Sequence, residues 1–260
     1  MPYGPNSFAV IVTSYKRPEL VQRAIHSVLT QRCTSWQLIV VNDSPTEDYS
    51  AVESLLETDE RASYIANPAN QGKNASLNKA FALLAAKEFR GHVIFLDDDD
   101  WLDPSCLEQF SAEISRTHAG WLVSNRIDTS GAPFTKNNTG GSLVRYVRDC
   151  LLLKRFRGDA THCIRFEEAS RCLFSEEVKN GEEWLFFAQV ARYFPEFNYL
   201  DTPGTISEGY LEDGLTRISL SKKQKLSLFR TLLHELYEKR LLDLETCMYM
   251  ILRLGKVVLS

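Results

Sequence analysis

The stretch Val93-Ile94-Phe95-Leu96-Asp97-Asp98-Asp99-Asp100 decides the fold class of this 260-residue chain. Four apolar residues make a run of strand length, and four adjacent aspartates end it abruptly. A strand without alternating polar residues is typical of a sheet that is covered on both faces. The stretch therefore predicts a buried strand whose carboxyl end carries a cluster of acids.

Two similar apolar runs lie earlier in the chain, at residues 8–12 and 38–41. Polar residues follow each run, at 13–17 after the first and at 42–44 after the second. Apolar residues at helical spacing separate the runs, which indicates strands joined by helices. The pattern predicts an α/β fold with a Rossmann-like, mostly parallel sheet flanked by helices. In such a sheet the polar ends of the strands meet at one edge, where ligands bind.

The composition excludes several classes of protein. Lys and Arg number 30 and Asp and Glu number 34, so the formal net charge of −4 argues against a binder of nucleic acids, which normally carries a basic excess. Apolar residues make up 44% of the chain, as in an ordinary globular protein. The six cysteines are scattered without a CxxC pair, so we interpret them as reduced and packed in the interior.

No stretch of the sequence resembles a membrane anchor or an export signal. The first residues carry no basic region followed by an apolar run, and 18 consecutive apolar residues occur nowhere. We therefore expect a cytoplasmic location. Peripheral association with the inner face of a membrane stays open as an alternative.

The two common phosphate-binding loops are missing from the polar edge. Residues 13–17 contain no glycine, so the dinucleotide-binding fingerprint is absent. Gly72-Lys73 is followed by Asn74 where a P-loop requires Ser or Thr, and Asn67 stands in place of its first glycine. A divalent cation held by acidic residues is another way to neutralise a bound phosphate.

The acidic run offers the ligands for such a cation. Close carboxylates repel one another unless a charge compensates them, and a hard cation such as Mg²⁺ or Mn²⁺ accepts carboxylate oxygens. Asp97 and Asp99 directly follow the strand and are the candidates. Asp103 precedes Pro104 at an expected helix start, so we interpret it as a helix cap. A solvated acidic turn is the alternative for the run as a whole.

At these residues the chain resembles the inverting family-2 glycosyltransferases of the GT-A fold. The resemblance is close over residues 7–110 and looser to about residue 195. It is carried, in order, by the four segments FAVIVTSYKRP at 8–18, LIVVNDS at 38–44, NQGKNASLN at 70–78 and FLDDDDWLDP at 95–104. The last of these resembles the DxD segment with which the family binds a metal.

The resemblance implies roles for the residues that would contact the donor nucleotide. Thr13, Tyr15 and Arg17 would line the pocket for the base and the diphosphate. The alternatives are that Tyr15 covers the edge of the sheet and that Arg17 pairs with a nearby carboxylate. Asp43 would accept a hydrogen bond from the pyrimidine ring. Lys73 would approach the diphosphate, with a solvated lysine at a helix start as the equally weighted alternative.

The resemblance also implies roles for the acidic residues. Asp97 and Asp98 would contact the nucleotide sugar, and Asp99 would bind the metal. Glu182 and Glu183 lie where the family places its catalytic acid pair, and the second of them maps onto the base. Two glutamates in the first turn of a helix also complement the helix dipole, which is the structural alternative.

The second half of the chain would form the acceptor side of the site. Strands are expected at residues 120–124 and 158–164, whereas residues 136–141 are expected to lie outside any packed element. His162 falls on the second of these strands. We interpret it as a structural histidine, with contact to a metal or to the acceptor as the alternative.

Two amphipathic helices are expected near residues 219–239 and 243–256. Packing on the catalytic domain explains their apolar stripes most simply. A homo-oligomer contact or docking on a membrane surface stays open. We divide the chain into a GT-A domain at 1–205, with a nucleotide-binding half at 1–110 and an acceptor-binding half at 111–205, and a loop with a helical C-terminal extension at 206–260.

Taken with the resemblance, the residues predict a metal-dependent inverting glycosyltransferase. It would move a sugar from a nucleotide diphosphate donor, most simply a UDP-sugar, to a hydroxyl of a saccharide or lipid-linked acceptor in bacterial-type surface polysaccharide synthesis. Two alternatives stay open. The first is a nucleotidyltransferase that makes nucleotide sugars, which would require a glycine-rich phosphate loop after the first strand. The second is a non-catalytic nucleotide- or sugar-binding module, which would not need the acids at 97 and 99.

Overall fold

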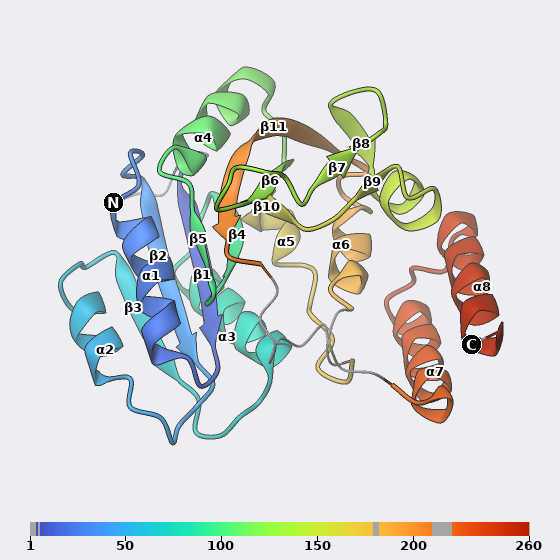
Figure 1. The fold of residues 1–260 in the computed structure, drawn as a ribbon, viewed down its shortest axis with the longest axis horizontal. Coiled ribbons are helices and arrows are strands. Elements are labelled where there is room, and N and C mark those ends of the chain that lie inside the picture. Colours follow the sequence, from blue (N-terminus) through green and yellow to red (C-terminus); the bar gives the residue numbers. More distant parts are fainter. Residues whose placement is uncertain (1–3, 5, 179–181, 210–219, 260) are drawn as a thin grey trace.

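A computed structural model describes residue 4 and residues 6–178, 182–209 and 220–259 of the chain. A twisted sheet runs through the molecule with helices on both of its faces (Figure 1). The strand order within the described residues is β3-β2-β1-β4-β10-β6-β11-β5, with β8 paired to β11. This arrangement confirms the expected α/β class.

The first half of the sheet is parallel, as the apolar runs predicted. Its strands are β1 (Phe8–Ser14), β2 (Trp36–Asn42), β3 (Ala62–Ala66) and β4 (His92–Asp97). In the register of these strands Ser14 lies beside Asn42, and Thr13 lies beside Asp97. The polar residues that end the three apolar runs therefore meet at one edge of the sheet.

Helices cover both faces of these parallel strands. They are α1 (Pro18–Leu29), α2 (Ser50–Leu56) and α3 (Lys73–Ala86). Successive residues of β1 enter opposite cores: Val10 packs in the core that contains α1, and Ile11 packs in the core that contains α3. Because each face buries a row of large apolar side chains, at about 1.5–3 kcal/mol for each fully buried one, the strands are held at fixed positions below the polar edge.

The second half of the sheet is mixed. Its strands are β5 (Asp100–Leu102), β6 (Trp121–Asp128), β8 (Leu143–Arg145), β10 (Ala160–Arg165) and β11 (Glu196–Ser207). Strand β10 runs antiparallel to both β4 and β6, whereas β11 runs parallel to β6. The helices of this half are α4 (Cys106–Thr117), α5 (Phe166–Ala169) and α6 (Trp184–Val190).

The expectation that residues 136–141 lie outside any packed element is wrong for its first two residues. Strand β7 (Lys136–Asn137) pairs with β9 (Phe156–Arg157) in a small second sheet, and the π-helical turn η1 (Tyr146–Leu152) lies between them in the chain. The pairing with β9 gives hydrogen-bond partners to backbone groups of the glycine-rich stretch. The buried side chain of Phe156 holds β9 against the core.

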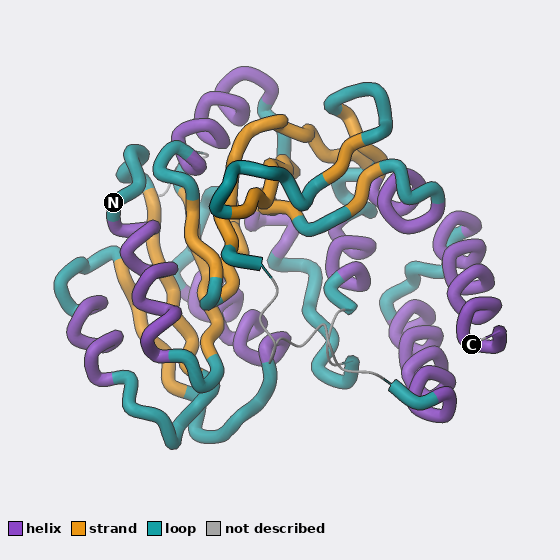
Figure 2. Tube along the Cα trace, viewed as in Figure 1, coloured by secondary structure: helices purple, strands orange, loops and turns teal. Residues whose placement is uncertain are grey.

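Both predicted C-terminal helices are present, as α7 (Lys222–Glu238) and α8 (Leu244–Leu259). Figure 2 shows them side by side at the end of the molecule away from β3. Leu232 and Leu236 of α7 are buried, and α8 packs against η1. No helix among the described residues is both long and apolar enough to cross a bilayer. The division of the chain at residue 205 stays a prediction.

Candidate active site

A cleft of about 810 Å³ opens at the carboxyl ends of β1 and β4. The predicted site residues that line it are Tyr15, Arg17, Lys73, Asp97, Asp98, Asp99 and Glu183. Thr13, Asp43 and Glu182 do not line it. The sheet edge on one side and the segment from η1 to β10 on the other therefore enclose one space between the two halves of the chain.

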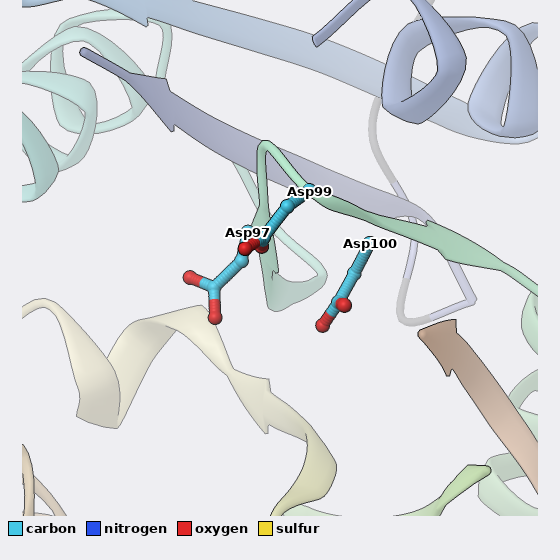
Figure 3. A group of neighbouring side chains, drawn as sticks. All are labelled: Asp97, Asp99 and Asp100. Carbon is cyan, nitrogen blue, oxygen red and sulfur yellow. The ribbon is translucent and has the colours of Figure 1, made fainter. Parts of the chain in front are cut away.

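The acidic run turns sharply between two strands, so that its members point in different directions. Asp97 ends β4, and Asp100 begins β5. One carboxylate oxygen from each of Asp97, Asp99 and Asp100 lies within 4.8 Å of the others (Figure 3). Asp98 turns toward the loop after β1, where its carboxylate accepts hydrogen bonds from the Tyr15 amide at 3.4 Å and from Arg17 at 3.2 Å.

Each acidic side chain of the run is paired with a cation. Arg17 bridges Asp98 and Asp99 at 3.2 and 3.3 Å. The Lys73 ammonium lies 2.6 Å from Asp97, and Arg126 lies 3.0 Å from Asp100. These ion pairs offset the electrostatic repulsion between the four adjacent carboxylates.

Burial and charge shift the titration of these groups in opposite directions. The Lys73 ammonium holds the pKa of Asp97 below its usual range, in spite of desolvation. Desolvation raises the pKa of Asp98 to about 6 and that of Asp100 to about 7, although Arg17 and Arg126 oppose these shifts. Burial lowers the pKa of Lys73, but the carboxylates of Asp97 and Glu183 more than offset it, so that the pKa is raised well above its ordinary value.

The donor set of the cluster fits a divalent metal. Asp97, Asp99 and Asp100 offer only carboxylate oxygens, which are the ligands that Mg²⁺ and Mn²⁺ prefer. Asp100 was not among the expected site residues. The signal for it was in the sequence, because the acidic run continues one residue past Asp99.

The two glutamates of the expected acid pair lie in different environments. Helix α6 begins at Trp184, so both residues precede its first turn. The Glu183 carboxylate faces the cleft, with Oε1 at 3.2 Å from Lys73 Nζ. The Glu182 side chain is buried and accepts hydrogen bonds from both terminal nitrogens of Arg253 in α8 and from the Trp184 indole. Of the two, only Glu183 is placed to reach a bound substrate.

Asp43 holds a loop together beneath the cleft. It is 3% exposed, and its two carboxylate oxygens accept hydrogen bonds from the Asn67 amide at 2.8 Å and from the backbone N–H groups of Gln71 and Gly72 at 2.8 and 2.7 Å. Gly72 adopts φ 89°, a left-handed conformation that favours glycine. Asp43 thus fixes the segment that leads into α3 and delivers Lys73 to the cleft. Its expected contact with a nucleotide base stays a prediction.

Two arginines of the site were missed by sequence reasoning. Arg126 ends up between Asp100, Asp159 at 2.7 Å and Ser207 at 2.8 Å. Its signal was the same as that of the other polar ends, since it follows the apolar run of β6. Arg253 had no local signal, because its partner Glu182 lies 71 residues away.

His162 lies in an aromatic environment at the wall of the cleft. Its Nδ1 accepts a hydrogen bond of 3.1 Å from the Trp121 indole, and its ring stacks on Phe187 with centroids 4.1 Å apart. Burial lowers the pKa of His162 to about 3, so the ring is neutral near pH 7. Among the described residues it is not part of the group that could hold a metal.

A mixed α/β sheet carries three clustered aspartates at the mouth of its cleft, and comparison with known proteins identifies the family. The model of glycosyl transferase family 2 matches residues 9–170. The chain belongs to this family. The resemblance expected from the sequence is confirmed.

Two relatives show the extent of the likeness. The chain is 29% identical over 194 residues to WcaA of Escherichia coli strain K12, provisionally named a colanic acid biosynthesis glycosyl transferase, with 71% of this chain and 66% of the relative covered. It is 26% identical over 213 residues to the GalNAc(5)-diNAcBac-PP-undecaprenol beta-1,3-glucosyltransferase of Campylobacter jejuni, with 80% and 66% covered. The matched part of the chain thus corresponds to 66% of the length of each relative.

A solved structure supports the fold. The crystal structure of S. aureus TarS 1-349 in complex with UDP-GlcNAc aligns with a TM-score of 0.72 at 18% sequence identity, covering 97% of this chain and 80% of that chain. The fold is therefore the GT-A fold that the sequence predicted.

Proposed function

We propose that this chain is a metal-dependent inverting glycosyltransferase that moves a sugar from a UDP-sugar to an acceptor hydroxyl. One observation carries the proposal. The acidic cluster at the end of β4 and the Glu183 carboxylate face the same cleft from different halves of the chain, and Lys73 bridges Asp97 and Glu183. A metal-dependent transferase needs both sets of carboxylates, one to hold the cation that neutralises the departing diphosphate and one to deprotonate the acceptor.

The loop after β1 and the acidic turn form the donor side of this site. Tyr15 and Arg17 line the cleft next to Asp98, and Thr13 lies beside Asp97 in the sheet. We assign the nucleotide to this loop, with Arg17 and Lys73 near its diphosphate. A UDP-sugar as donor is supported by TarS, which has a similar fold and whose structure holds UDP-GlcNAc.

Asp99 would hold the metal, with Asp97 and Asp100 as the neighbouring oxygen donors. A bound Mg²⁺ or Mn²⁺ supplies a Lewis acid for the negative charge that builds on the leaving diphosphate. Arg17 lies 3.3 Å from Asp99. With a metal bound to Asp99 in place of this ion pair, the Arg17 guanidinium would be available to the diphosphate. Asp98 keeps the loop after β1 in position by accepting the Tyr15 amide.

Glu183 is the proposed general base. It would accept the proton of the acceptor hydroxyl while that oxygen attacks the anomeric carbon on the face opposite the diphosphate, and such an in-line attack inverts the configuration. Lys73 lies 3.2 Å from Glu183 and holds this carboxylate at the wall of the cleft. Glu182 would position the base through its contacts with Arg253 and Trp184, rather than take part in the reaction.

The acceptor is proposed to be a saccharide, free or lipid-linked, in the synthesis of a surface polysaccharide. The support comes from relatives, since WcaA is named for colanic acid biosynthesis and the Campylobacter enzyme for an undecaprenol-linked saccharide. The aromatic wall of His162, Phe187 and Trp184 beside Glu183 suits the apolar face of a sugar ring.

Peripheral association with an anionic bilayer is part of the same proposal. The outward face of α8 is apolar, with Leu244, Met248, Ile251 and Leu252 exposed to 77, 49, 69 and 56%. Residues 220–260 carry eight Lys or Arg against four Asp or Glu in a chain of net charge −4. Sedimentation with phosphatidylglycerol vesicles that fails with the Ile251→Ser/Leu252→Ser variant is the expected result. The proposal of membrane association would be contradicted if the wild type did not sediment with the vesicles and instead formed a dimer that the same variant disrupts.

Release of the nucleoside diphosphate tests the main proposal. The protein is incubated with a panel of nucleotide sugars, Mn²⁺ and simple saccharide acceptors, with Asp99→Asn as the matched control. We expect UDP to be released from a UDP-sugar by the wild type alone. In a separate incubation with UTP and a sugar phosphate, release of pyrophosphate would instead indicate a nucleotidyltransferase. Tight nucleotide binding without release from any donor would indicate a binding module.

A further inference from the structure

The acceptor half of the cleft is bordered by a strongly basic segment. Residues 136–157 contain six Lys or Arg and one Asp, although the whole chain carries a net charge of −4. This segment forms β7, η1 and β9. This segment therefore brings an excess of positive charge to the side of the cleft that η1 and β9 form.

Two of these cations reach the cleft itself. Lys154 and Arg157 line it, and both are exposed. Neither forms an ion pair with any carboxylate in the described part of the chain. The deeper cations of the cleft differ, because Arg17, Lys73 and Arg126 are each bound to an acidic side chain.

The position of Lys154 is held by its surroundings. It adopts φ 53°, a left-handed backbone conformation that is uncommon for a residue with a side chain, and its Nζ lies 5.6 Å from the centre of the Tyr249 ring. Burial lowers the pKa of Lys154, and the nearby positive charges of Lys256 and Arg253 lower it further. A third cation, Lys256 of α8, thus adds to the same field, and it too is exposed and forms no ion pair among the described residues.

We infer that Lys154, Arg157 and Lys256, here called the cationic rim, bind a phosphate group carried by the acceptor. This inference rests on the proposed function and names the class of its acceptor. Lys154 and Lys256 repel each other and have no carboxylate partner among the described residues, and Arg157 lines the same cleft as Lys154. An anion with several strong acceptor oxygens relieves such repulsion.

The rim lies on the acceptor side of the base. Tyr146 and Cys150 of η1 line the cleft together with Lys154 and Glu183, so Lys154 and the base border one space. Lys154 is near Cys150 and Tyr249. An acceptor whose phosphate lies at Lys154 and Arg157 would share the cleft with Glu183, where the reacting hydroxyl is needed, while Arg17 and the acidic turn remain with the donor.

Binding of farnesyl diphosphate in non-ionic detergent micelles tests the rim without any donor or metal. The variant is Lys154→Gln/Arg157→Gln, and the matched control is Arg90→Gln, an exposed cation in the loop between α3 and β4. We expect the rim variant to bind about tenfold more weakly or worse, as for a lost charge-assisted hydrogen bond. The control should bind farnesyl diphosphate as tightly as the wild type does. Farnesol, which lacks the diphosphate, should bind to neither the wild type nor the control. Circular dichroism and thermal melting confirm that the variants are folded.

Three results would overturn the inference. The rim variant could bind as tightly as the wild type, the Arg90→Gln control could lose as much affinity, or Arg17→Gln alone could abolish binding, which would assign the diphosphate to the donor side. A soluble glycerol phosphate oligomer is measured in parallel. Rim-dependent binding of the oligomer alone identifies a phosphodiester polymer as the source of the phosphate, and rim-dependent binding of farnesyl diphosphate alone identifies a lipid-linked diphosphate.

The outcome is independent of the donor chemistry. Calorimetric binding of UDP and its Mn²⁺ dependence are measured on the same wild-type protein. If UDP does not bind, the proposed function fails, whereas the comparison between the rim variant and its control still decides whether the rim takes a phosphate.

Discussion

Glu182 and Glu183 are consecutive in the chain, yet their carboxylates bind cations from two widely separated helices, α3 and α8. Glu183 lies 3.2 Å from Lys73 at the start of α3, and Glu182 accepts a 2.8 Å hydrogen bond from Arg253 in α8. The first contact faces the cleft and the second is buried. The pair therefore joins three parts of the molecule at the point where the proposed base is needed.

This arrangement separates the effects of the two glutamine substitutions. Glu183→Gln is expected to lower kcat by roughly 10²–10⁴-fold, the usual scale for loss of a general base, while UDP and Mn²⁺ still bind. Glu182→Gln should reduce kcat less and should lower the free energy of unfolding by about 1–3 kcal/mol, because it weakens a buried, charge-assisted contact. Steady-state kinetics and urea unfolding of both variants measure the two effects.

Arg253→Gln serves as the control for the second substitution. If Glu182 acts through its contact with Arg253, Arg253→Gln should reproduce the loss of stability, and the double variant should lose little more. The opposite ranking of the two glutamine variants in kcat would move the base to Glu182, and no effect of either would place it elsewhere.

Removal of the charge at Asp99 should abolish the response to the metal. Asp99→Asn keeps the shape of the side chain and removes the charge that a hard cation requires. Activity is expected to collapse, and Mn²⁺ should no longer strengthen UDP binding in a calorimetric titration. Asp103→Asn, in the loop that follows β5, is the matched control and should keep both. Near-normal metal-dependent turnover of Asp99→Asn would refute the assignment.

Substitution of Asp43 is expected to affect both the donor and the stability of the fold. Asp43→Ala leaves the N–H groups of Gln71 and Gly72 without their acceptor, at a cost of about 1–3 kcal/mol. Because the loop that carries Lys73 loosens, the donor KM should rise more than kcat falls. Asp43→Asn retains one acceptor oxygen and should be milder. Unchanged UDP affinity of Asp43→Ala would remove Asp43 from the nucleotide site, whatever its effect on stability.

The half-buried His162 ring, stacked on Phe187, predicts a loss of stability in acid. Its pKa is about 3 in the folded chain and near 6.5 when unfolded, so only the unfolded chain takes up a proton between these values. The stability that depends on the neutral ring is complete above pH 6.5 and is lost as the pH falls toward 3, by about 2 kcal/mol at pH 5.

A variant that cannot titrate isolates this contribution. His162→Gln keeps an acceptor for the Trp121 indole, so its free energy of unfolding should fall by about 2 kcal/mol less than that of the wild type between pH 7 and pH 5. Urea unfolding at the two pH values measures the difference. Parallel losses in both proteins would show that His162 can be protonated in the folded chain.

The parallel half of the fold was predictable from the sequence because its signals are local. An apolar run that ends in polar residues gives both the strand and the edge at which it ends, and for β4 it also gave the acids at 97 and 99. The strand β7 was missed because its glycine-rich surroundings contain no apolar run. Its partner β9 lies some 20 residues further along the chain, so no local pattern marks the pair.

The ion pairs of the site could not be read from the sequence. Arg17 meets Asp98 across 81 residues, and Lys73 meets Glu183 across 110, and neither spacing has a pattern that marks it. The hydrogen bonds of Asp43 could not be read from the sequence either. Its position after a strand marked it as a site residue, but its three donors come from the loop at 67–72. The resemblance mapped the base onto the second of the two adjacent glutamates, whereas the contact of the first with Arg253 in α8 lies beyond the part of the chain where the resemblance extends.

The most direct measurement of the central claim is the release of UDP from UDP-sugars in the presence and absence of Mn²⁺, with Asp99→Asn and Glu183→Gln alongside the wild type. The account predicts release by the wild type that EDTA abolishes, loss of Mn²⁺-stimulated UDP binding in Asp99→Asn only, and intact binding without turnover in Glu183→Gln. Metal-independent release, or turnover by Glu183→Gln at the wild-type rate, would contradict it.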